Sequence, residues 1–89
     1  MAAMTLTGDA RTVMESMGRF MNRDYARAVG GEDLLRWTGL EPRALAEAVR
    51  ALAERPHPYV RAVFHPDDPD RLVEVRLTVD GEMYCRSRD

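Results

Sequence analysis

The first third of the chain carries apolar residues at the spacing of a helix. Residues three and four positions apart share one face of a helix. Five apolar residues follow this spacing: Val13, Met14, Met17, Phe20 and Met21. Asp9 stands just before them, and aspartate commonly caps helix N-termini. The pattern predicts a helix over residues 9–28, with Tyr25 and Val29 extending its apolar side.

Two shorter helices are predicted after the glycine pair Gly30-Gly31, which breaks the first pattern. One covers residues 32–37 and the other covers residues 42–54. Pro42 suits the first position of the latter helix, because the N–H that proline lacks would have no helical partner there.

Thr38-Gly39-Leu40 joins these two helices in a tight turn, and Gly39 is free to adopt a positive φ. We expect Leu40 to be buried between the two helices and Leu45 to face back onto the first of them. The same apolar seam continues through Val49 and Leu52.

The spacing of apolar residues changes to two after Pro58. Residues 59–64 and 72–77 read as two strands of an antiparallel hairpin, joined by a loop rich in proline and aspartate. Met83 to Asp89 is expected to form a short tail with at most one helical turn. The order of helix, helix, helix, strand and strand predicts a single α+β domain over residues 1–89.

The segment from Leu34 to Leu52, with its Thr-Gly-Leu turn, resembles the winged helix-turn-helix family of bacterial transcription regulators. In that family the turn precedes a recognition helix, and a β-hairpin called the wing follows, which matches residues 59–77. Leu77-Thr78-Val79-Asp80-Gly81 is similar to the Leu-Thr-x-x-Gly that closes such wings. The resemblance covers residues 10–85. It implies a three-helix winged helix-turn-helix with a C-terminal antiparallel β-hairpin wing.

The resemblance also implies which residues would contact DNA. Arg43, Ala44, Glu47 and Arg50 are the positions of the recognition helix that would face a major groove, and arginine can read guanine through two hydrogen bonds. Arg36 is a candidate for gripping phosphate. A stripe of arginines at positions 11, 19, 23 and 27 could do the same, although a solvated helix face explains it more simply.

Charge in the wing departs from the family's pattern. Family members commonly place a basic wing tip against DNA, whereas this hairpin loop carries Asp67, Asp68 and Asp70 beside Arg71 alone. Residues 1–61 have a formal charge of +1 and residues 62–89 have −3. An acidic wing would be repelled by a polyanion and would release no counterions from it.

Composition excludes several classes of protein. The 89 residues contain one cysteine, Cys85, so neither an intrachain disulfide nor a four-cysteine zinc site can form. The absence of a long apolar run and of a signal-peptide pattern predicts a cytoplasmic chain that does not enter a membrane. The acidic loop lacks the glycine and terminal glutamate of a calcium-binding EF-hand, so no metal is expected. Without a phosphate-binding loop or a nucleophile–base pair, we expect no cofactor and no enzyme activity.

Two functions therefore remain open. In the first, the chain is a small DNA-binding transcription regulator that acts as a homodimer, because one small module seldom binds DNA tightly alone. In the second, it is a winged-helix module for protein–protein interaction or dimerisation, since Gly39 to Leu45 is also similar to dimerisation modules of bacterial enzymes. The family resemblance favours DNA narrowly, and the acidic wing favours protein.

Overall fold

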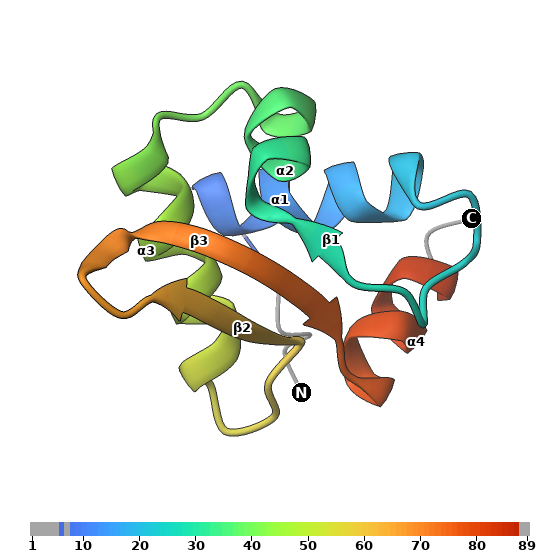
Figure 1. Ribbon diagram of the computed structural model, residues 1–89. Coiled ribbons are helices and arrows are strands. Elements are labelled where there is room, and N and C mark those ends of the chain that lie inside the picture. Colours follow the sequence, from blue (N-terminus) through green and yellow to red (C-terminus); the bar gives the residue numbers. More distant parts are fainter. Residues whose placement is uncertain (1–5, 7, 88–89) are drawn as a thin grey trace.

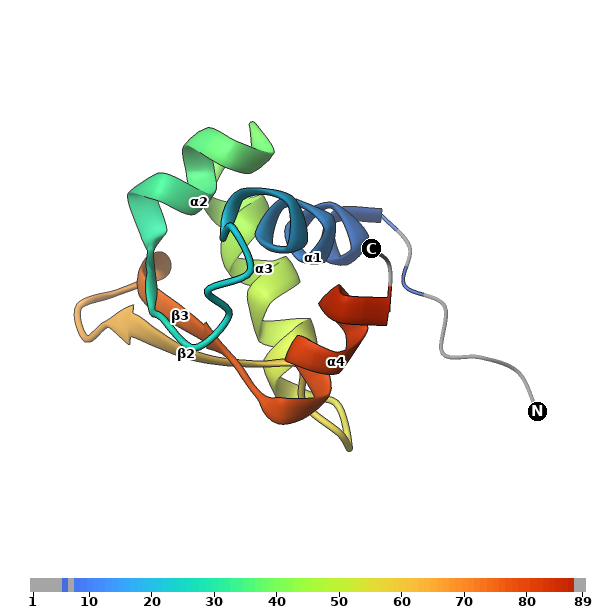
Figure 2. The ribbon, with the colours of Figure 1, turned by 90° about the vertical axis from the view of Figure 1, so that its right-hand side faces the viewer.

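A three-stranded antiparallel sheet with helices packed on one of its faces organises the computed structural model, which describes residue 6 and residues 8–87 (Figure 1). Its strands are β1 (Val29–Gly30), β2 (Val60–His65) and β3 (Asp68–Leu77), in the order β1-β3-β2. Figure 2 shows α1, α3 and α4 on the same side of this sheet. The expectation of an α+β fold is confirmed.

Four helices accompany the sheet among the described residues: α1 (Gly8–Phe20), α2 (Gly31–Thr38), α3 (Pro42–Glu54) and α4 (Val79–Ser87). The ranges 32–37 and 42–54 predicted for the second and third helices agree with α2 and α3 to within one residue at each end. Pro42 stands at the start of α3, where its missing N–H costs nothing.

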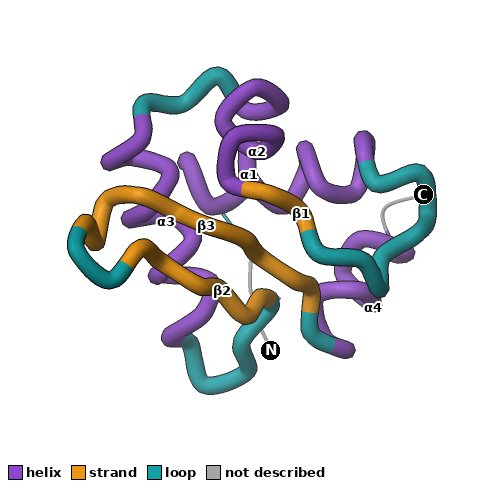
Figure 3. The backbone as a smooth tube through the Cα atoms, viewed as in Figure 1, coloured by secondary structure: helices purple, strands orange, loops and turns teal. Residues whose placement is uncertain are grey.

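The prediction of one helix over 9–28 is wrong beyond α1, which ends at Phe20. Asn22 and Arg23 adopt positive φ values of 55° and 65°, and a right-handed helix cannot continue through left-handed residues. Figure 3 shows the following segment as a loop that leads into β1. Tyr25 and Val29 are nevertheless buried, because the loop turns them into the same core. Asp9 lies exposed in the first turn of α1, inside the helix and not before it.

The helix α4 is longer than the single turn that the sequence predicts. Thr78 begins it, since its Oγ1 accepts a hydrogen bond from the backbone N–H of Gly81 at 3.1 Å, as an N-terminal cap does. In the sequence Gly81 suggests a turn, but in the structure it allows α4 to pack closely against the backbone of Tyr59. A Cβ at this position would collide with the carbonyl oxygen of Tyr59.

The hairpin of β2 and β3 pairs antiparallel as predicted, but its turn is much shorter than the expected loop over 65–71. Only Pro66 and Asp67 separate the strands, because His65 pairs with Asp68. The register then shifts so that Phe64 pairs with Leu72, and the residues between 68 and 72 bulge out of the ladder.

The core lies between the sheet and the helices. Its largest side chains with less than 2% exposure come from α1, from the residue that follows it, and from α2 and α3: Met14, Met17, Met21, Leu34, Leu45 and Leu52. Leu45 is therefore buried as expected. Leu40 is only partly buried, packed against the core from the turn between α2 and α3.

Candidate nucleic-acid interface

The turn between α2 and α3 connects the two helices of the predicted helix-turn-helix. Gly39 has a φ of 71°, as expected, and its N–H donates to the carbonyl of Leu35 at 2.9 Å. Thr38 Oγ1 donates to the carbonyl of Leu34 at 2.8 Å and accepts from the N–H of Leu40 at 3.2 Å. These bonds occupy backbone groups that a helix end would otherwise leave unpaired.

Arg43 and Glu47 lie one turn apart on the exposed side of α3. Their side chains are 79% and 63% exposed, and Arg43 Nε lies 3.5 Å from Glu47 Oε2. Ala44 beside them is half-buried. The pair therefore presents neighbouring opposite charges to solvent, and this part of α3 carries no net positive charge for a phosphate backbone.

Arg50 is not directed outward as the sequence predicts. It is half-buried, its guanidinium lies 4.6 Å from the centre of the Phe64 ring, and its Nη2 donates a hydrogen bond to the carbonyl of Pro69. These contacts attach α3 to β2 and to the bulge of β3. Arg50 would have to give up both contacts in order to reach a base edge.

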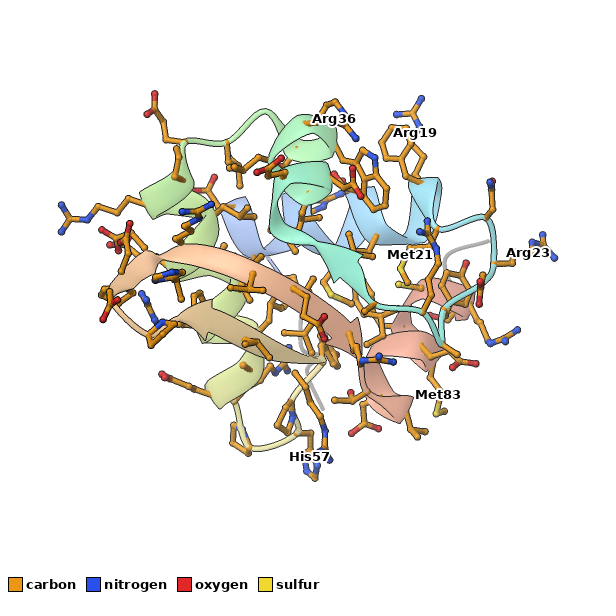
Figure 4. The ribbon with its side chains drawn as sticks, in the orientation of Figure 1. Arg19, Met21, Arg23, Arg36, His57 and Met83 are labelled. Atoms are coloured by element: carbon orange, nitrogen blue, oxygen red, sulfur yellow. The ribbon has the colours of Figure 1, made fainter. Side chains whose placement is uncertain are left out.

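Arg36 lies on α2 and pairs with Asp33 one turn earlier in the same helix. Figure 4 shows Arg36 at the end of α2, away from the hairpin turn. Its position in the last turn of the helix is where the helix dipole favours a cation. Arg36 is thus paired within its own helix, as Arg43 is.

The hairpin turn is acidic in the structure as well as in the sequence. Asp67 and Asp68 are exposed, and among the described residues neither forms an ion pair. Asp70 is half-buried in the bulge, with its N–H bonded to Asp68 Oδ1 at 3.1 Å, so it does not stand at the tip as predicted. No group of three or more potential ligands within residues 8–87 is arranged to hold a metal ion.

A cavity of about 300 Å³ lies between α2, α3 and β3, and the sequence gives no signal for it. Leu35, Leu45 and Leu72 contribute apolar side chains to its wall, and Asp68 and Asp70 contribute acidic ones. β3 is distant in sequence from α2 and α3, so only the packing of the strand against the two helices creates this space.

A second feature that the sequence does not reveal joins α1, α2 and the loop between them. Phe20 at the end of α1 stacks on Trp37 of α2, with ring centres 5.5 Å apart and planes at 28°. Arg19 lies over Phe20, and Arg27 from the loop lies over Trp37. We call these four residues the arginine–aromatic stack.

The predicted stripe of arginines on one helix face is wrong, because Arg27 reaches the stack from outside the helix.

Arg11 belongs to the part of that stripe that is helical. Its Nε donates to Glu15 Oε2 at 2.8 Å, and this hydrogen bond, together with the charge of Glu15, raises the pKa of the Arg11 guanidinium. Arg11 is thus paired within α1.

None of the helices described here is both long enough and apolar enough to cross a lipid bilayer. A comparison with known proteins found no matching family model, no matching curated protein and no matching solved structure.

Proposed function

We propose that this chain is a winged-helix-like module that binds protein, and that its surface formed by α3 and the hairpin does not bind DNA. The order of elements supports the winged-helix part of the proposal, because a helix-turn-helix is followed directly by a β-hairpin. Function is a separate matter, since one fold serves many purposes. The charges on the surface support protein over DNA as the partner.

The contact of Arg50 with the hairpin is the observation that carries the proposal. Of the two arginines on α3 that would read bases, Arg50 is held by Phe64 and the Pro69 carbonyl, and Arg43 lies beside Glu47. An arginine reads guanine only when its guanidinium is free to approach the base edge with two donors. The base-reading capacity of α3 is therefore low.

The surroundings of α3 oppose DNA as well. Acidic side chains outnumber basic ones on the exposed parts of α3, of its flanking residues and of the hairpin. On α3, its flanking residues and the hairpin, the exposed acids are Glu41, Glu47, Glu54, Asp67 and Asp68, and the exposed arginines are Arg43, Arg61, Arg71 and Arg76. Proteins gain most of their non-specific DNA affinity by neutralising phosphates and releasing counterions. This surface would instead place like charges together.

A titration of labelled duplex DNA tests the proposal. We expect no saturable binding by the wild-type chain at about 50 mM salt or at about 200 mM salt. The variant D67N/D68N removes two exposed charges from the hairpin turn. It should gain weak binding at the lower salt concentration and lose it at the higher one, because relief of repulsion between exposed charges is screened by salt.

The variant D9N/D80N is the matched control, because it has the same net charge and changes exposed residues outside the hairpin. It should behave like the wild-type chain. Saturable binding of DNA by the wild-type chain, weakened by R43Q, would overturn the proposal in favour of a DNA-binding regulator.

A further inference from the structure

The arginine–aromatic stack leaves two guanidinium groups without acidic partners. Arg19 and Arg27 form no ion pair with any residue that the structure describes. Arg27 Nη2 donates only a long hydrogen bond, 3.5 Å, to the carbonyl of Phe20. Both groups are oriented by the rings beneath them, at 5.5 Å from the centre of Phe20 and 5.9 Å from that of Trp37.

The chemistry of the stack fits a carboxylate. A guanidinium that rests on an aromatic ring keeps its N–H edge available, and the fork of donors on that edge matches the two oxygens of a carboxylate. Orientation by the ring lowers the entropy that the side chain loses on binding. A nucleobase would have to compete with these guanidinium groups for the rings. Phe20, which is 41% exposed, adds an apolar surface beside the charges.

The hairpin turn of the same chain has the complementary chemistry. Asp67 lies in the tight two-residue turn and Asp68 directly follows it; both are exposed and lack ion-pair partners among the described residues. Figure 4 shows Arg19 on the side of the molecule opposite the hairpin turn, so the two surfaces cannot meet within one chain.

We infer that the partner of the stack is a second copy of this chain, whose hairpin turn places Asp67 and Asp68 against Arg19 and Arg27. This inference rests on the proposed function as a protein-binding module and names its partner and its surface. The contact is head-to-tail, because it joins two different surfaces. Each added copy leaves one turn and one stack free, so such a contact builds open chains unless its rotation closes a ring.

The strength of the contact follows from its size. Exposed ion pairs contribute little each, and the turn is a small surface, so the contact is weak. The inference requires a dissociation constant of about 10⁻⁴ M at low salt. Association should weaken at least about tenfold when salt is raised from about 50 mM to about 500 mM, because salt screens exposed charges.

Sedimentation velocity on two complementary variants tests the inference. R19Q/R27Q lacks the charges of the stack, and D67N/D68N lacks those of the turn. Each variant alone should remain monomeric at concentrations where the wild-type chain associates. An equimolar mixture should form a complex of two chains and nothing larger, because only the turn of the first variant and the stack of the second are intact.

Trp37 is the single tryptophan of the chain and gives a second readout inside the stack. Its fluorescence in the stack-intact variant D67N/D68N should change when R19Q/R27Q is added. Adding R19Q/R27Q/D67N/D68N, which lacks an acidic turn, should leave that fluorescence unchanged. The variant R11Q/R86Q loses two arginines elsewhere and should associate like the wild-type chain.

The inference would be overturned if the wild-type chain stayed monomeric at about 1 mM, a concentration well above the expected dissociation constant. It would also be overturned if either double variant alone still associated, or if the mixture of the two formed no complex. Quenching of Trp37 by an acidic peptide in a chain that stays monomeric would assign the stack to a different acidic partner. Failure here is separable from failure of the proposed function, which only DNA binding by the wild-type chain overturns.

Discussion

The guanidinium of Arg50 lies 4.6 Å from the centre of the Phe64 ring, and this contact joins the third helix to the hairpin. The same side chain donates a hydrogen bond to the carbonyl of Pro69 in the bulge of β3. A residue that sequence reasoning assigns to DNA thus contacts two parts of its own chain. Its role in stability can be measured separately from any role in binding.

Replacing Arg50 with glutamine should lower the free energy of unfolding by about 1–2 kcal/mol, since the variant loses a cation–π contact and a hydrogen bond. Urea unfolding measures the change. R43Q is the matched control on the same helix. It removes a pair that is mostly exposed, so the free energy should change by less than about 0.5 kcal/mol. Equal losses from the two variants would show that the contact with the hairpin contributes nothing.

Adjacent glycines at the start of α2 should respond differently to alanine. A Cβ on Gly31 would collide with the backbone carbonyl of Leu72, whereas a Cβ on Gly30 would meet only Asp33 Oδ2 at 3.9 Å. G31A should therefore cost about 2 kcal/mol or more, because the backbone of β3 must shift. G30A should cost less than about 0.5 kcal/mol. Thermal unfolding of both variants measures the difference, and a tolerant G31A would argue against the close approach of α2 to β3.

Gly39 should be sensitive for a different reason. Nothing lies within 4 Å of a Cβ built there, so the cost of G39A comes from its φ of 71° alone. That cost should be about 1 kcal/mol, and G39N should cost less because asparagine tolerates left-handed backbone better. Chemical denaturation checks the order of the two variants. If alanine and asparagine proved equally harmless, the left-handed conformation of the turn would be refuted.

Cys85 should react with thiol reagents only when α4 separates from α1. Its side chain is 2% exposed, and its Sγ lies 3.9 Å from the carbonyl oxygen of Met14 in α1. Reaction with a disulfide reagent should therefore be slow in buffer and should accelerate steeply in urea, because a buried thiol is modified through local or global opening. Fast modification in buffer would mean that α4 does not stay docked.

Local patterns in the sequence predict some elements well and others poorly. The range of α3 is predictable because Pro42 marks its start and its apolar residues keep one period throughout. The end of α1 is not, since Met21, Tyr25 and Val29 continue a helical spacing although the chain has already left the helix. β1 has only two residues, which is too short for any alternation to show.

The candidate site is predictable only in its composition. The acidic turn can be seen in the sequence, but the inward orientation of Arg50 depends on Phe64 and Pro69, which approach it only after folding. The arginine–aromatic stack likewise combines α1, α2 and the loop between them. A helical projection treats each element alone, so it cannot show which polar residues will find partners in another element.

The central position of β3 has a consequence for how the chain folds as it is synthesised. β3 pairs with β1 on one edge and with β2 on the other, yet of the three described strands it leaves the ribosome last. The backbone of Val29 can pair in the sheet only after Val75 has been synthesised. The growing chain therefore holds its apolar helix faces without their central strand until residue 77 has emerged, and contacts so distant in sequence form slowly. Folding is expected as one late, cooperative event, and a nascent chain arrested before β3 is the form most exposed to aggregation.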